Sequence, residues 1–271
     1  TWGLAQSVLT EAVARLVIAL AWFWRIRSHV LEGLIWLEQA IRLPGLTTAT
    51  RAGVLYHAGH LAWMQDDFAG AQARTQESLR LWQSLGPAGR RGAGYASHTL
   101  GMAFYGTELR APGDLMAALH SFQVSEDLFA AVGDVWGVAF AQQWLAFVHT
   151  AQGDRVAALA AAEASLAGFR QIGNAWGAGL TLGALANLKL QAGDLAAARD
   201  LAEEAQALRR QIGHRHSLGV ILELLARIAR KENKPAEAAV FYQEAILVFD
   251  SMGNQPSAAQ MRAALAALTT V

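Results

Sequence analysis

The feature that most constrains this chain is an internal repeat with a period of 40 residues. Glycine or asparagine followed by a polar residue recurs at this period in one series, Gly113-Asp114, Gly153-Asp154, Gly193-Asp194 and Asn233-Lys234. A second series has the same period but is offset by 20 residues, and consists of Gly133-Asp134, Gly173-Asn174, Gly213-His214 and Gly253-Asn254. Repeats of this length predict an array of units in which each unit stacks on its neighbours.

Both series are typical of helix ends. Glycine suits the left-handed backbone position just past a helix, and an Asp or Asn after it accepts the free N–H groups of the next helix. Between these pairs of Gly or Asn and a polar residue, which we call the turn marks, lie stretches of about 18 residues with apolar residues at helical spacing. Alternating β-branched residues are rare, so strand signals are weak. The sequence therefore predicts an all-α chain in which each unit is helix A, tight turn, helix B, tight turn.

Small residues recur at three fixed places in the units. Helix A carries Ala21, Gly59, Gly101, Ala146, Ala186 and Ala226, and helix B carries Gly33, Ala71, Ala118, Ala158, Ala198 and Ala238. Seven residues further on come Ala40, Ser78, Ser125, Ser165, Ala205 and Ala245. Small side chains at these places let neighbouring helices approach closely.

The units predict six helix pairs, at about 8–42, 47–85, 90–132, 134–172, 174–212 and 214–252, and a final capping helix at about 255–268. The third unit is longer, because Gly101 and Ala118 are 17 residues apart where the other units have 12. We expect this insertion at residues 107–113, where Pro112 and Gly113 favour a loop. The chain begins with Thr1, and we expect it to be a piece of a longer protein.

The pattern of Leu145-Ala146, Ala158, Ser165 and Gly173 resembles a tetratricopeptide repeat. The unit here is longer than the usual repeat of about 34 residues, and the family's Trp, Tyr and Pro marks are largely missing. The resemblance covers roughly residues 8 to 268. It implies a right-handed superhelical solenoid that forms a single domain over residues 1–271.

A finer resemblance is carried by the segment Ala21 to Ile41, together with the later "GD" turns and the "IGN" and "VGD" ends of helices. These features are similar to the C-terminal sensor of bacterial signal-transduction ATPases of the STAND class, including LuxR-type regulators that resemble the maltose-operon activator. The resemblance implies a cytoplasmic transcription regulator whose ATPase and DNA-binding domains are partners of the repeats. The repeats would bind an inducer and release autoinhibition. No P-loop motif is present, so this chain would be the sensor part alone.

In the tetratricopeptide family, the concave surface is formed by four positions of each helix A, at −6, −3, +1 and +4 from its small residue. The candidate ligand-binding residues carried over in this way are Arg15, Trp22, Arg25, Tyr56, His60, Trp63, Tyr95, His98, Met102, Tyr105, Phe140, Gln143, Phe147, Asn187, Glu223 and Arg227. The first four repeats supply aromatic residues with His and Arg among them, which suits recognition. We therefore predict that repeats one to four bind the signal, with packing between adjacent A helices as the open alternative. Gly53 and Gly183, at the same offset, would leave room for a ligand or a neighbouring backbone.

Four tryptophans outside the groove positions are predicted to have mainly structural roles. Trp136, Trp176 and His216 follow the turn mark at the same place in successive units, and a residue that repeats at the period is usually structural. Trp36 and Trp82 lie on predicted B helices, where we expect a role in the core or on the convex surface.

Several kinds of chemistry are disfavoured by the composition and motifs. The chain has no Cys, which excludes thiolate catalysis and Cys-based zinc sites. His57 and His60 share a helix face but lack a third ligand in register, so we expect no metal and no cofactor. Asp66 and Asp67 are expected to cap a helix, and His214 to replace a capping residue. Glu223 is the one acidic residue among the groove positions, which argues against an enzyme.

Charge and hydropathy limit the kinds of partner that the chain is expected to have. The formal net charge is zero, which argues against direct nucleic-acid binding. The apolar run from Leu16 to Trp24 is too short to span a bilayer, which needs about 20 residues, and predicts a buried helix. The sequence thus favours a non-catalytic module that senses a peptide, a protein or a small molecule, including a sugar by resemblance. The alternative is a scaffold or oligomerisation module without a small ligand.

Overall fold

The structure is a computed structural model that describes residues 2–27, 29–108, 114–213 and 215–268. These residues form thirteen α-helices and one 3₁₀ turn, and no strand. The helices follow one another as consecutive pairs with a final helix, which confirms the predicted all-α repeat architecture.

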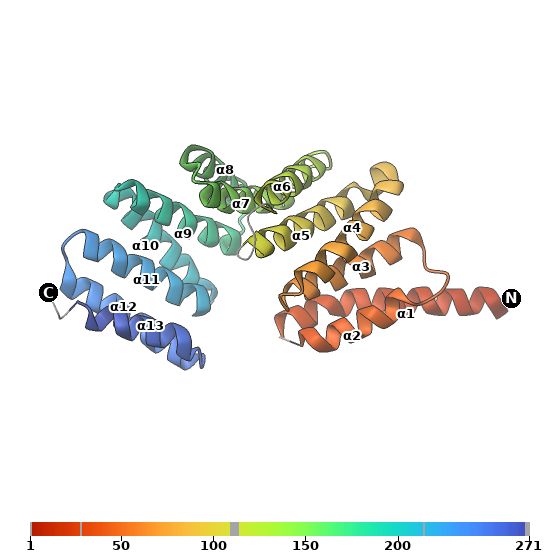
Figure 1. Cartoon of the computed structure of the whole chain (residues 1–271), viewed down its shortest axis with the longest axis horizontal. Coiled ribbons are helices and arrows are strands. Elements are labelled where there is room, and N and C mark those ends of the chain that lie inside the picture. The colour runs from red at the N-terminus through yellow and green to blue at the C-terminus, as the bar shows by residue number, and fades with distance from the viewer. Residues whose placement is uncertain (1, 28, 109–113, 214, 269–271) are drawn as a thin grey trace. The chain divides into compact units, whose positions relative to one another are not determined.

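The contacts divide the chain into two compact units, residues 1–153 and 154–271. The first unit contains α1 (Trp2–Ile26), α2 (Val30–Ile41), α3 (Thr48–Trp63), α4 (Phe68–Ser84), η1 (Gly86–Gly89), α5 (Arg90–Glu108), α6 (Asp114–Ala130) and α7 (Val135–Gln152) (Figure 1). The second contains α8 (Arg155–Gln171), α9 (Ala175–Ala192), α10 (Leu195–Ile212), α11 (Arg215–Lys231), α12 (Pro235–Ser251) and α13 (Gln255–Ala266). The boundary falls inside the fourth predicted pair, and a single domain over the whole chain stays a prediction.

The periodic marks end and begin helices as the sequence predicts. Gly153 and Gly193 adopt left-handed backbone with φ of 78° and 82°. The Asp154 side chain accepts a hydrogen bond from the Ala157 N–H at 3.0 Å, and begins α8. Asn233 takes the left-handed position in its repeat, with φ of 59°. The expected capping role of His214 lies outside the described residues.

The small residues lie where helices meet, and every one of the predicted positions is buried. A Cβ added to Gly59 would lie 2.5 Å from Cγ2 of Thr75, and one added to Gly101 would lie 2.8 Å from the Phe122 ring. Separations this short leave no room for a side chain, so the helix spacing depends on glycine at these two places.

Two predicted boundaries need correction. Helix α5 continues to Glu108, so Thr107 and Glu108 are helical although both were expected in the loop of the insertion. The rest of that predicted loop, residues 109–113 with Pro112 and Gly113, lies outside the described residues. Helix α1 begins at Trp2, earlier than the expected start at about residue 8.

The apolar run in α1 is buried on one side only. Val17, Ala21 and Trp24 are buried, whereas Leu16 is 60% exposed and Phe23 is 49% exposed. The predicted buried helix therefore buries one face only, because the run belongs to an edge helix whose other face is exposed. None of the helices in the described part of the chain is long and apolar enough to cross a bilayer.

A large side chain fills the same place near the end of successive B helices, a periodicity that the sequence analysis missed. The residues are Trp82, Phe129, Phe169, Arg209 and Phe249. Glycines give them room: an added Cβ at Gly92 would lie 2.3 Å from Trp82, at Gly137 2.3 Å from Phe129 and at Gly177 2.4 Å from Phe169. In the fifth repeat an arginine takes the place of the ring, with its side chain only 1% exposed.

Candidate ligand-binding cavity

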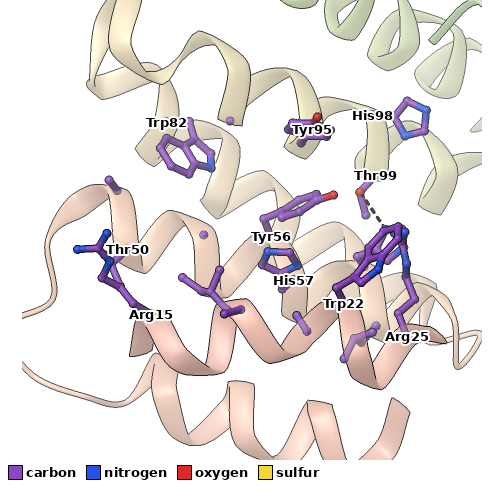
Figure 2. A pocket seen from close by; sticks show the side chains of 18 of the residues that line it. Arg15, Trp22, Arg25, Thr50, Tyr56, His57, Trp82, Tyr95, His98 and Thr99 are labelled. Carbon is purple, nitrogen blue, oxygen red and sulfur yellow. Dashed lines mark hydrogen bonds between the residues drawn. The ribbon is translucent and has the colours of Figure 1, made fainter. Parts of the chain in front are cut away.

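The first unit contains a cavity of about 900 Å³ between the A helices α1, α3, α5 and α7. Half of the predicted groove residues line this cavity, namely Arg15, Trp22, Arg25, Tyr56, His60, Tyr95, His98 and Phe140. Figure 2 shows Arg15 beside Thr50 at one end of the pocket and Trp22 with Arg25 at the other. A volume of this size accommodates a small organic ligand or a short peptide segment.

Helical spacing explains why these side chains share one cavity. Arg15, Trp22 and Arg25 recur at intervals of seven and three residues on α1, which places them along one face. Tyr56 and His60 are four residues apart on α3 and also share a face. Gly53 lines the cavity, and an added Cβ there would lie 3.0 Å from Cδ1 of Ile18, which also lines it. At Gly183 the added Cβ would lie 2.7 Å from Cδ1 of Ile221, so an isoleucine of another A helix lies against each glycine.

A line of polar contacts crosses the cavity at its Arg25 end. Arg25 Nη1 lies 3.3 Å from His60 Nε2, and His60 Nδ1 lies 3.4 Å from Oγ1 of Thr99. The Arg25 guanidinium also stacks over the Trp22 ring at 3.8 Å, a cation–π contact. The three helices α1, α3 and α5 are thus connected through side chains that line the same cavity.

Burial keeps the histidines of this region neutral. Loss of water lowers the pKa of His57 to about 4 and that of His60 to about 3, and the nearby Arg25 charge lowers both further. Burial likewise lowers the pKa of His98 to about 3, and raises the pKa of Tyr56 to about 12. At neutral pH these groups carry no charge, so the charged groups that line the cavity are Arg15, Arg25 and Glu11.

Glu11 lines the opposite end and was missed by the sequence analysis. Its carboxylate accepts hydrogen bonds from the Thr50 hydroxyl, from the Thr47 N–H at 3.1 Å and from the Thr47 hydroxyl at 3.0 Å. The Thr50 bond, followed by the Thr47 bonds and the Arg15 charge, lowers the pKa of Glu11. A signal was available, because Glu11 lies four residues before Arg15 on the same helical face.

Two tryptophans that were not among the predicted groove residues line the cavity. Trp82 lines the cavity from helix α4, whereas a core or convex position was expected. Its indole reaches this place because Gly92 on α5 has no side chain to block it. Trp136, for which a structural role was expected, packs against Phe140 with ring centroids 4.8 Å apart and also lines the cavity.

Three of the other predicted groove residues of the first unit, Trp63, Tyr105 and Phe147, pack around a residue that was not predicted, Trp144. Its ring centroid lies 6.2 Å from that of Trp63, 5.8 Å from that of Tyr105 and 5.7 Å from that of Phe147. Trp63 Nε1 donates a hydrogen bond to the Met102 carbonyl oxygen at 3.1 Å. Met102 and Gln143 are each 3% exposed. None of the five residues Trp63, Met102, Tyr105, Gln143 and Phe147 lines the cavity. For Trp63, Met102 and Tyr105 the contacts run between A helices, as in the alternative of packing.

The predicted residues of the second unit are also absent from the cavity lining. Asn187 and Glu223 are half-buried and Arg227 is exposed. For metal binding, the described ranges contain no group of three or more His, Asp or Glu side chains placed to hold an ion.

Known proteins match this chain in its repeats and in its fold. A family model described as tetratricopeptide repeat matches residues 177–251, which lie in the second unit. No curated protein matches the chain.

Solved structures match over nearly the whole chain at low sequence identity. BtubC from P. vanneervenii is 14% identical with a TM-score of 0.67, over 92% of this chain and 91% of that one. A signal-transduction ATPase with numerous domains and a tetratricopeptide-repeat sensor, from Pyrococcus horikoshii, is 14% identical with a TM-score of 0.74, over 97% of this chain and 40% of that one. NprR in complex with its cognate peptide NprX is 15% identical with a TM-score of 0.65, over 96% of this chain and 72% of that one. Residues 177–251 therefore match the tetratricopeptide repeat, and the chain has the fold of tetratricopeptide-repeat proteins.

Proposed function

We propose that this chain is the non-catalytic sensor module of a signal-transduction ATPase that regulates transcription in the cytoplasm, and that it binds its signal in the cavity of the first unit. The observation that carries the proposal is the cavity itself, about 900 Å³ and lined by aromatic rings, neutral histidines and two arginines. Rings with polar edges next to a few charged groups are typical of ligand sites. The similar fold of an ATPase with a tetratricopeptide-repeat sensor, and of NprR bound to a peptide, supports this role.

The mechanism that we propose is a shift between conformations. The cavity wall is assembled from A helices of successive repeats, which contact mainly their neighbours. A ligand that contacts α1, α3 and α5 together favours the helix spacing that fits it best, by as much as its affinities for the alternatives differ. In the parent protein this change would alter contacts with the ATPase and DNA-binding domains and relieve autoinhibition.

A second candidate function is an interaction scaffold. It is favoured by apolar side chains that α1 exposes at helical spacing, Leu9 at 66%, Leu16 at 60% and Phe23 at 49%. Exposed apolar stripes of this kind mark contact surfaces. A scaffold would use this face and would not need the cavity.

Thermal unfolding with fractions of a source-cell extract distinguishes the two functions. We expect the small-molecule filtrate, or the macromolecular retentate if the signal is a peptide or protein, to raise the unfolding temperature of the wild type. Trp22→Ala should lose this stabilisation, because Trp22 lines the cavity and is 59% exposed, so that its removal disturbs the fold little. Trp176→Ala, a 40% exposed tryptophan of the second unit, is the control that should keep the effect. Equal stabilisation of both variants would rule out the cavity as the signal site.

A further inference from the structure

Arg25 is the charged group of the cavity whose charge is not balanced. Among the lining residues Glu11 is the acidic one, and its carboxylate is held by Thr47 and Thr50 with Arg15 close by. Arg25 lies 14 residues further along α1, which is about 21 Å at the usual rise of an α-helix. None of the ion pairs within the described ranges includes Arg25. Its guanidinium is instead half-buried between the Trp22 ring and His60.

The direction of the hydrogen bonds at Arg25 follows from its chemistry. A guanidinium only donates, so His60 Nε2 accepts the bond from Arg25. The proton of the neutral imidazole is therefore on Nδ1, which donates to Oγ1 of Thr99.

Arg25 and Tyr56 both bring hydrogen-bond donors to the cavity. Arg25 keeps N–H groups beyond the one that meets His60, and the Tyr56 hydroxyl has an O–H to donate. Figure 2 shows Tyr56 and Arg25 on facing helices on either side of Thr99. The two donors therefore define a position suited to an acceptor, and the positive charge favours an acceptor that is anionic.

The removal of Arg25 from water also favours an anion at this place. Burial lowers the pKa of Arg25, which means that the protein environment disfavours its charged form. An anion next to the guanidinium would offset this cost. A single cation and one hydroxyl match a monoanion, whereas a doubly charged phosphate would bring uncompensated charge against the aromatic wall.

We infer that the Arg25 end of the cavity is a carboxylate subsite, in which Arg25 and Tyr56 bind a ligand carboxylate while the body of the ligand packs on Tyr95, Trp136 and Phe140. This inference rests on the proposed function, because it names the chemical class of the ligand for the same cavity. The carboxylate has two possible sources, a small aromatic acid or the terminal carboxylate of a peptide. A peptide that reached from Arg25 to Glu11 would have about six extended residues, at about 3.4 Å per residue.

The test compares acids with their neutral amides at constant ionic strength and neutral pH. The probes are indole-3-acetate against indole-3-acetamide, and an N-acetylated hexapeptide library with terminal carboxylates against the same library with terminal amides. Binding to the whole chain is measured by the shift of the unfolding temperature over a titration to about 10 mM. We expect at least one class of acid to bind the wild type about tenfold more tightly than its amide. The class that binds identifies the source of the carboxylate.

Three variants tie the effect to the subsite. Arg25→Gln should weaken acid binding by about tenfold or more and remove the preference for acid over amide. Tyr56→Phe, which keeps the ring and removes only the hydroxyl, should weaken it by a few fold. Arg80→Gln removes the same charge from the exposed surface of α4 in the same unit and should change nothing.

The inference is overturned if acids and amides bind equally, if Arg25→Gln binds acids like the wild type, or if the wild type binds neither class of acid. The proposed function survives each of these results when cell-extract fractions still stabilise the wild type but not Trp22→Ala. In that case the cavity takes a signal without a carboxylate. If no cell-extract fraction stabilises the wild type, the result would instead count against the proposed sensor function.

Discussion

At the scale of single residues, Arg209 is the clearest departure from the repeat. It takes the place that phenylalanine occupies in other B helices, at Phe129, Phe169 and Phe249, and it is 1% exposed. Among the residues that the structure describes, its Nε and both Nη atoms have no hydrogen-bond partner. Burial lowers the pKa of Arg209 to about 10. A buried charge without a partner destabilises the folded state.

Replacing this charge should therefore stabilise the protein. We predict that Arg209→Met, which keeps the length of the side chain, raises the free energy of unfolding by about 1–3 kcal/mol. Urea unfolding measures the difference. Arg210→Met is the matched control, because Arg210 is 54% exposed and pairs with Glu244 at 2.5 Å, a surface contact worth at most about 1 kcal/mol. A loss of stability in Arg209→Met would mean that the buried guanidinium has a stabilising partner.

The buried histidines predict a pH dependence with a defined sign. The folded pKa values of His57, His60 and His98, at about 4, 3 and 3, lie below the unfolded value of 6.5. The unfolded chain therefore binds more protons at acid pH, and stability falls as the pH drops from 6.5 toward 3 to 4. Each of these histidines contributes a slope of about 1.4 kcal/mol per pH unit within that window.

His98→Phe tests this account at one position. His98 stacks on Phe140 with ring centroids 4.3 Å apart, and a phenyl ring retains this aromatic contact. We expect the slope of unfolding free energy against pH to become shallower by about 1.4 kcal/mol per unit below pH 6.5. The slope is the readout, because the substitution also changes the absolute stability. An unchanged slope would mean that His98 takes up its proton in the folded state.

At the scale of helices, the sequence predicts the elements well because their ends are set by local chemistry. Gly153 and Asp154 end one helix and begin the next through a left-handed backbone and a side-chain cap, both of which depend only on adjacent residues. Thr107 and Glu108 were assigned to a loop because Pro112 and Gly113 mark the break. The marks do not say how far the preceding helix continues, and α5 extends to Glu108.

The candidate site was predicted only in part, because its residues depend on contacts between helices. The fixed offset on each A helix found Trp22, Tyr56 and Tyr95, which do share the cavity. It missed Trp82, which enters from a B helix where Gly92 admits the ring. It also missed Trp144, which lies outside the cavity lining at a different offset and stacks on Phe122 with centroids 5.5 Å apart. No single-helix rule contains these long-range packing partners.

At the scale of the whole molecule, the two compact units differ in what they carry. The second unit holds the residues that match the tetratricopeptide-repeat model and has no aromatic residue at its groove positions. The first unit holds the cavity, and its A helices, together with Trp82 of α4, supply the aromatic and basic lining. Repeat arrays tolerate such differences, because the packing residues of a unit are separate from those it presents on its surface.

The most direct test of the central claim is amide hydrogen exchange on the whole chain, with and without the extract fraction that raises its unfolding temperature. A ligand in the cavity should slow exchange in the lining segments of the first unit, residues 11–25, 53–61 and 92–99. The account predicts strong protection in these three segments and weaker effects in α9 to α13. Protection confined to the second unit, or none in the three lining segments, would contradict it.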